Sequence, residues 1–277
     1  MKRERLAFCT FFLLISSCTS TGTATPTAIL STPTPINLPT HTAASGNAVT
    51  LENLRLTIPE GLASDAASET VPAVTGTDAP PWEVAPAHTK ITLTGYALED
   101  KFHEPAIYVY PAEEFAGASS VAAEQIDRLR NLLTGSILPL RETLPSVPFF
   151  NAAPLIAAQI QMMPFQNGSG VRSLTQYAQY NAPVNNRELF YHFQGLTEDG
   201  AFYLVAVLPV SAPVLAEDES PEASVPAEGV PIPTDIGPND VYYASITQKL
   251  NALSPDDFTP ALDSLDALMN SILVTNP

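Results

Sequence analysis

Apolar and polar residues alternate in several short segments of the chain, and this period of two predicts β-strands. In "PAIYVYP", Ile107 and Val109 fall on one face, while Tyr108 and Tyr110 fall on the other. Similar patterns occur in "LRLTI" and in "HTKITLT". The sequence therefore predicts separate strands at residues 54–58, within 88–98 and within 105–111.

Two pairs of longer segments have the pattern of β-hairpins. The first pair, "AAQIQMMPF" and "VRSLTQYAQ", is separated by the turn-forming stretch "QNGSG". The second pair, "RELFYHFQGL" and "AFYLVAVLPV", is separated by "TEDG". Both faces of the last segment are apolar, which predicts a central strand that is covered on both sides.

Three other segments have apolar residues at the spacing of an amphipathic α-helix. Ser119 or Ser120 is expected to cap the first helix, and Asp240 the second. Thr259 and Pro260 are expected as the N-cap and first residue of the third. The three segments cover residues 119–135, 240–253 and 259–272.

These elements together predict the fold class. Short turns favour antiparallel pairing, and helices late in the chain favour an α+β fold, here a mainly antiparallel β-sheet with helices packed on it. Residues 49–277 are expected to form a single domain. Proline-rich and acidic stretches near 60–87 and 211–240 are expected to be disordered or solvated loops within it.

The beginning of the chain has the pattern of an export signal. Lys2, Arg3 and Arg5 form a positive region, and the apolar run that follows is too short to span a bilayer. The run ends in "ISSC", which resembles the bacterial lipobox and implies that Cys18 receives a diacylglycerol. Residues 1–17 are therefore expected to be a lipoprotein signal peptide. Two acyl chains on Cys18 would anchor the protein stably at an extracytoplasmic membrane surface.

Residues 18–48 are expected to be a disordered stalk. The stretch is rich in Thr and Pro and lacks charge, so it cannot bury enough apolar surface to offset the entropy of ordering. A chain of this composition is extended and semi-rigid. It would hold the folded domain away from the membrane.

Charge and cysteine content exclude several classes of function. The net charge of −17 would repel the phosphate backbone, so nucleic-acid binding is not expected. Anionic lipid headgroups would also be repelled, so attachment to a membrane requires the lipid on Cys18. Cys9 and Cys18 are the two cysteines, so residues 19–277 can form neither a disulfide scaffold nor a thiolate metal site. No cofactor or metal is expected.

Three segments resemble parts of PsbP-type domains: "LRLTIPEGL" the opening strand and turn, "LFYHFQGLTEDGAFYLVAVLP" the central hairpin, and "LDALMNSILV" the closing helix and strand. The chain as a whole resembles uncharacterised bacterial lipoproteins with Thr/Pro-rich stalks. The PsbP-like family includes extrinsic binding and assembly factors without chemistry of their own. The resemblance therefore implies a non-catalytic role.

Histidines and acids supply the candidates for chemistry. "LEDKFHEP" brings Glu99, Asp100, His103 and Glu104 close in sequence, either as a metal or acid–base cluster or as a polar connection between strands. His192 shares a predicted strand face with Glu188, Phe190 and Gln194 and could be half of a catalytic pair, but no nucleophile motif accompanies it.

Tyrosines supply a candidate binding face, because each offers apolar area and a polar tip for a sugar, a peptide or an envelope protein. The sequence thus predicts a membrane-anchored, non-catalytic binding or assembly module. The alternatives are an extracytoplasmic hydrolase that uses Glu99, Asp100, Glu104 and Glu188, or a purely structural envelope protein. The tyrosines on or beside predicted strands are Tyr108, Tyr110, Tyr177, Tyr180, Tyr191 and Tyr203.

Overall fold

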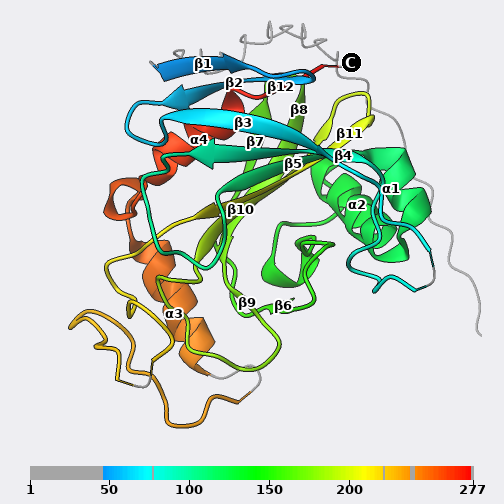
Figure 1. Cartoon of the computed structure of the whole chain (residues 1–277). Coiled ribbons are helices and arrows are strands. Elements are labelled where there is room, and N and C mark those ends of the chain that lie inside the picture. The colour runs from blue at the N-terminus through cyan, green and yellow to red at the C-terminus, as the bar shows by residue number, and fades with distance from the viewer. Residues whose placement is uncertain (1–45, 77, 221, 238–240, 276–277) are drawn as a thin grey trace, which may run out of the picture. The chain divides into compact units, whose positions relative to one another are not determined.

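Antiparallel β-sheets form the centre of the protein, as the computed structural model in Figure 1 shows. The structure describes residues 46–76, 78–220, 222–237 and 241–275. The predicted signal peptide, Cys18, most of the predicted stalk and the predicted cap Asp240 lie outside the described residues. Residues 43–277 belong to one compact unit.

The main sheet has seven strands in the order β3-β4-β5-β11-β10-β8-β7, and every neighbouring pair is antiparallel. β1 and β12 flank β2 in a second sheet, and β6 pairs with β9. The strands of the main sheet are β3 (Asp65–Val71), β4 (His88–Thr94), β5 (Ala106–Pro111), β7 (Ala158–Phe165), β8 (Gly168–Thr175), β10 (Phe190–Thr197) and β11 (Phe202–Pro209). The others are β1 (Gly46–Thr50), β2 (Leu54–Pro59), β6 (Ala153–Pro154), β9 (Tyr177–Ala178) and β12 (Leu273–Val274).

Both predicted hairpins are present. β7 and β8 pair up to Phe165 and Gly168, and β10 and β11 pair up to Leu196 and Tyr203. β11 lies between β10 and β5, and its residues from Tyr203 onward are buried. The apolar residues on both of its faces therefore belong to a central strand, as the sequence predicts.

Four α-helices occur in the described residues, and two lie on each side of the main sheet (Figure 1). They are α1 (Ala112–Ala118), α2 (Ser120–Leu133), α3 (Val241–Ala252) and α4 (Leu262–Asn270). The Ser119 hydroxyl accepts a hydrogen bond from the Ala122 N–H at 3.3 Å and caps α2 as expected. The α+β fold class is thus confirmed.

The predicted start of the last helix is wrong. α4 begins at Leu262 after Ala261, and Thr259 is paired with Ser211 in an antiparallel bridge. The Thr259 N–H and C=O both bond to Ser211, which holds Thr259 in an extended conformation and prevents it from joining the helix. α1 has no counterpart among the predicted helices, because its seven residues are too few to show a helical period.

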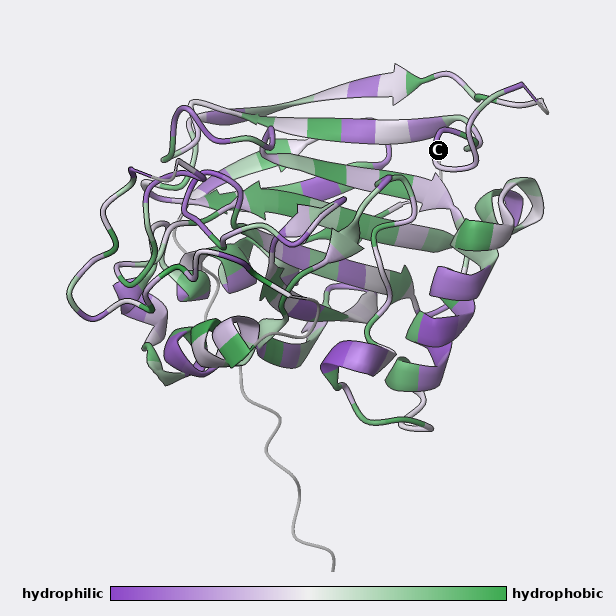
Figure 2. Cartoon of the chain, turned by 90° about the horizontal axis from the view of Figure 1, so that it is seen from below, coloured by the Kyte–Doolittle hydropathy of each residue, from purple (hydrophilic) through white to green (hydrophobic). Residues whose placement is uncertain are grey.

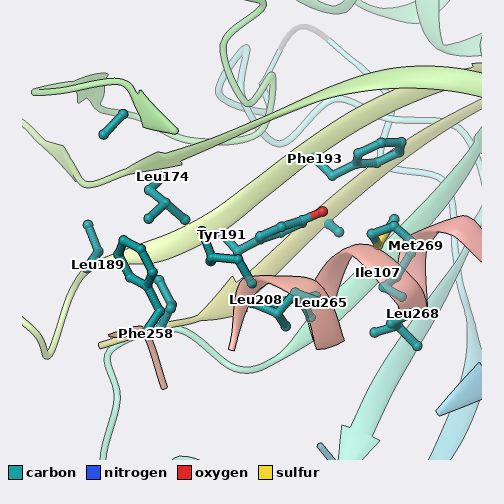
Figure 3. Close-up of a cluster of buried hydrophobic side chains, with 14 of the residues drawn as sticks. Ile107, Leu174, Leu189, Tyr191, Phe193, Leu208, Phe258, Leu265, Leu268 and Met269 are labelled. Atoms are coloured by element: carbon teal, nitrogen blue, oxygen red, sulfur yellow. The ribbon is translucent and has the colours of Figure 1, made fainter. Parts of the chain in front are cut away.

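Two hydrophobic cores lie on the opposite faces of the main sheet. Alternate residues of each strand point to each core, so Ile107 packs on the α3/α4 side and Tyr110 on the α1/α2 side. Figure 2 shows hydrophobic residues along the strands that separate these cores. Figure 3 shows Leu265, Leu268 and Met269 of α4 facing this sheet.

Three predicted irregular regions differ from expectation. Residues 60–87 contain β3, an edge strand with one buried side chain, Ala66, so it has no apolar alternation to reveal it. The predicted stalk ends too late, since residues 46–48 belong to β1, which pairs with β2. The described part of 211–240 has no helix or strand, yet Val214 and Leu215 are buried against the domain.

In the part of the chain that the structure describes, no helix is both long enough and apolar enough to cross a membrane.

Candidate binding site

A cavity of about 580 Å³ opens on the α1/α2 side of the sheet, next to the beginning of β10. This volume is typical of pockets for small ligands. Four loop segments and Glu188 surround it, and most of the large side chains are aromatic. Its lining consists of Trp82, Phe102, His103, Phe149, Phe150, Asn151, Ala152, Tyr177, Ala178, Gln179, Tyr180, Ala182 and Glu188.

Packed aromatic rings form the inner wall. His103 stacks on Phe150 with centroids 5.2 Å apart, and Tyr177 meets Phe150 edge to face at 5.3 Å. Fully buried Phe190 at the start of β10 lies behind them, 4.6 Å from His103. Such contacts add stabilisation beyond burial. The wall is therefore formed before any ligand arrives.

Backbone pairing fixes the segments that carry these rings. The Phe102 N–H donates to the Arg187 carbonyl at 2.9 Å, which ties the loop before β5 to the loop before β10. Tyr177 belongs to β9, and its hydroxyl accepts from the Val147 N–H at 3.0 Å. Burial raises the pKa of Tyr177 to about 12, so it is protonated and neutral.

Three apolar rings at the opening are exposed to solvent. The exposed fractions are 36% for Trp82, 63% for Phe102 and 70% for Tyr180. Exposed apolar surface grouped around a concave site commonly marks a place of binding. These three rings are free to contact a ligand.

Two titratable groups complete the lining. Glu188 is half-buried, and its Oε2 accepts hydrogen bonds from Gln176 Nε2 at 2.6 Å and Asn185 Nδ2 at 3.3 Å. Burial raises the pKa of Glu188. Burial also lowers the pKa of His103 to about 4, so this ring is neutral at neutral pH. None of the described residues that line the cavity is Lys or Arg.

A second, more polar cavity of about 310 Å³ shares Tyr177 with the first and contains His192. Gln194 Nε2 lies 2.8 Å from His192 Nε2 and donates to the Pro145 carbonyl, while the Tyr203 hydroxyl donates to Gln194 Oε1. Burial lowers the pKa of His192 to about 3. His192 Nε2 therefore lies against an amide nitrogen, and no hydroxyl of the described residues is hydrogen-bonded to it, so the geometry gives no support to a nucleophile–base pair.

The predicted single tyrosine face does not exist. Tyr177 and Tyr180 line the aromatic cavity, and Tyr108 is half-buried against Phe149. Tyr110 and Tyr203 are buried, the first under Phe115 of α1. A strand alternates its faces, and the covering helices lie far away in sequence, so the tyrosine pattern could not show which rings remain accessible.

Tyr191 points to the other face, where α4 covers it (Figure 3). Its hydroxyl donates to Asp266 Oδ1 at 2.8 Å. Arg172 Nε lies 3.0 Å from the same oxygen, an ion-pair distance, although its N–H is not aligned for a hydrogen bond. This buried tyrosine is therefore a link between the sheet and α4, and the sequence interpretation of it as a binding residue is wrong.

The residues of "LEDKFHEP", considered either as a metal or acid–base cluster or as a polar connection between strands, separate in space. Glu104 forms an ion pair with Lys90 at 2.6 Å, and His103 turns into the aromatic cavity. Asp100 lies in another cavity with Lys101. Among the described residues, no group of three or more His, Cys, Asp or Glu side chains could hold a metal ion.

Sequence reasoning missed most of the cavity. Phe102, Phe149 and Phe150 lie in loops without hydrophobic periodicity, so no pattern marked them as neighbours. Trp82 in "APPWEVAP" was the one lining residue that the sequence marked as unusual, because a large aromatic residue in a proline-rich loop must pack on the domain or remain exposed. The cavity forms where four loop segments meet, which only the fold determines.

Comparison of the chain with protein-family models, with curated proteins and with solved structures gives no match.

Proposed function

We propose that this protein is a lipid-anchored, extracytoplasmic binding module that holds a small ligand in the aromatic cavity without transforming it. The observation that carries the proposal is the cavity of about 580 Å³ with its exposed rim of Trp82, Phe102 and Tyr180. Concave, mostly apolar sites with a few polar groups are the usual form of small-molecule sites.

The arrangement of acids favours binding over hydrolysis by paired carboxylates. Such hydrolases need two acids across one site. Of the four acids considered for this role, Glu188 lines the aromatic cavity, and Glu104 pairs with Lys90. Asp100 lies in a different cavity, and Glu99 is exposed and is not part of the aromatic cavity's lining. Glu188 lacks a second acid among the described lining residues, so it is suited to contact a ligand and not to share a proton with a partner.

The proposed location depends on the sequence. The short apolar run before "ISSC" supports export and lipidation of Cys18, and the Thr/Pro-rich segment after it supports a spacer. A binding module on such a spacer would meet ligands at the outer surface of the membrane that holds it. Other envelope proteins remain candidate partners of the same module.

The test uses Trp82, the single tryptophan of the chain, as a reporter inside the cavity. Soluble glycans, peptides and amines are titrated into the full chain in detergent while tryptophan emission and product formation are followed. We expect a saturable change in emission with one ligand class and no product. Turnover of a glycan or peptide would favour the hydrolase, and a lack of response to every class would contradict a binding function.

A pair of variants locates the site. Tyr180→Leu removes an exposed ring from the cavity, whereas Leu138→Ala removes an equally exposed apolar side chain outside it. A ring contact is worth about 0.5–1.5 kcal/mol, so Tyr180→Leu should raise the Kd about threefold to tenfold. Leu138→Ala should leave the Kd unchanged. Equal effects of the two variants would place the ligand elsewhere.

A further inference from the structure

The charges of the aromatic cavity select among ligand classes. Its lining contains one carboxylate, Glu188, and no Lys or Arg among the described residues. His103 is kept neutral by burial against Phe150 and Phe190, which lowers its pKa to about 4. At neutral pH a ligand therefore meets aromatic rings and one negative charge.

Aromatic rings favour positively charged organic groups. The face of a Trp, Tyr or Phe ring is electronegative and attracts an organic cation through its quadrupole, most strongly when water is excluded. Six such rings line the cavity, at residues 82, 102, 149, 150, 177 and 180. The net charge of −17 would also raise the local concentration of cations.

The described hydrogen bonds of Glu188 all reach one of its two carboxylate oxygens. Gln176 and Asn185 both donate to Oε2, and no hydrogen bond from the described residues reaches Oε1. The two amides hold the carboxyl group in place. Arg187 and Glu219, which pair with each other, are the charged groups that act on Glu188 from outside the cavity. Oε1 is therefore the group that an incoming cation would meet.

From this geometry we propose that the ligand is a small organic cation that carries a quaternary or alkylated ammonium group. The exposed rings of Trp82, Phe102 and Tyr180 receive the ammonium group, and the carboxylate of Glu188 balances its charge. The inference rests on the proposed function and names the ligand class of the same cavity.

A neutral sugar fits this lining less well. Sugars are held by several side chains that offer free hydrogen-bonding groups. The amide nitrogen of Gln179 already donates to the Asn151 carbonyl at 2.9 Å, and Oε2 of Glu188 already accepts two hydrogen bonds. The lining exposes more apolar than polar surface, which suits an alkylated ammonium because that group needs no hydrogen-bonding partner.

The experiment compares choline with 3,3-dimethyl-1-butanol, which has the same shape and lacks the charge. Each is titrated into the full chain in detergent, with Trp82 emission and the thermal midpoint as readouts. We expect choline to bind at least about fivefold more tightly than the alcohol, as a partly desolvated cation–π contact requires. Benzyltrimethylammonium, which fills more of the cavity, should bind more tightly than choline.

Matched variants separate the charge from the rings. Glu188→Gln keeps an oxygen for Gln176 and Asn185 but removes the charge, and it should weaken choline binding at least about fivefold. Glu52→Gln changes the net charge equally at an exposed site between β1 and β2 and should leave binding unchanged. Tyr180→Phe retains the ring and should bind choline, whereas Tyr180→Leu should not retain wild-type affinity.

The outcomes distinguish this inference from the proposed function. Equal binding of choline and its uncharged analogue, or saturable binding of a neutral glycan without binding of choline, would overturn the cation and leave the binding module standing. No saturable response to any ligand class would overturn both.

Discussion

At the scale of single residues, burial determines which titratable groups are charged. His192 is fully buried beside Gln194, and His103 packs between Phe150 and Phe190. Both have a lowered pKa, to about 3 and about 4, because a charged imidazole would lose its hydration in these positions. In the sequence both histidines lie near acids or amides, and burial in the folded protein keeps both of them neutral at neutral pH.

These two histidines predict a loss of stability in mild acid. In the unfolded chain a histidine takes up a proton below a pKa of about 6.5, whereas the folded protein resists protonation of His103 until about pH 4. The unfolded state thus binds more protons as the pH falls through this window. Stability is fully present above pH ~6.5, and each such histidine removes about 1 kcal/mol between pH 6 and pH 5.

Urea unfolding of the wild type and of His103→Phe at several pH values measures the contribution of one histidine. Phe retains an aromatic ring for the stack on Phe150 but cannot take up a proton. The difference in free energy of unfolding between the two proteins should therefore change by about 1 kcal/mol from pH 6 to pH 5. Carboxyl groups such as Glu188 titrate in both proteins and cancel in this difference. A difference that stays constant with pH would show that His103 takes up its proton as readily in the folded state as in the unfolded state.

At the scale of secondary-structure elements, glycines determine how β8 and β10 meet. Gly170 pairs with Gly195 across the two strands, and the ring of Phe193 lies over both. A Cβ on Gly170 would stand 2.3 Å from the Phe193 ring and 2.4 Å from the Gln194 carbonyl oxygen. Glycine is required here because the aromatic ring fills the space of the missing side chains.

Gly170→Ala should therefore destabilise the protein by about 1–3 kcal/mol, the usual cost of overpacking a core. Gly117→Ala is the matched control, because Gly117 lies in α1 with no atom within 4 Å of the added Cβ. It should be neutral or stabilising by up to about 1 kcal/mol, since alanine favours helix. Thermal or urea unfolding measures both, and similar effects would show that the strands can separate enough to admit the methyl group.

The sequence predicted the elements well where one face alternates with another. β5 was found because Ile107 and Val109 alternate with Tyr108 and Tyr110. β10 and β11 were found as two strand-like segments on either side of "TEDG", and α2 because Ala122, Ile126 and Leu129 recur at helical spacing. β3 was missed because its side chains are mostly exposed and its hydrogen bonds to β4 define it instead. A strand that is held by backbone hydrogen bonds alone need not show alternating apolar residues in its sequence.

At the scale of the whole molecule, separate roles are proposed for the described domain and the N-terminal segment. The domain supplies two cores and an aromatic cavity, and the segment before residue 46 carries the lipobox-like "ISSC". Attachment to a membrane is predicted from the segment alone, because the acidic domain would be repelled by anionic lipids.

Cys18→Ala tests this separation. The variant removes the thiol that would receive the diacylglycerol, so we expect the protein to leave the membrane fraction after cell fractionation. Cys9→Ala is the control and should remain in the membrane fraction, because Cys9 lies within the apolar run that is expected to be removed. Ligand binding by the released protein should be unchanged, since no lining residue of the cavity precedes Trp82. An unchanged distribution of Cys18→Ala would contradict lipidation at this residue.

The sequence by itself determined the fold class, the two hairpins and the covered central strand, because these depend on local periodicity and turn chemistry. It also predicted a lipid anchor at Cys18, because the lipobox-like pattern consists of consecutive residues. Only the tertiary structure decided which aromatic residues line a site. Trp82, Phe102, Phe150 and Tyr180 come from separate loops, and they meet because the strands between them pair at long range. Periodicity describes what a segment buries, whereas a cavity depends on which segments the sheet brings together.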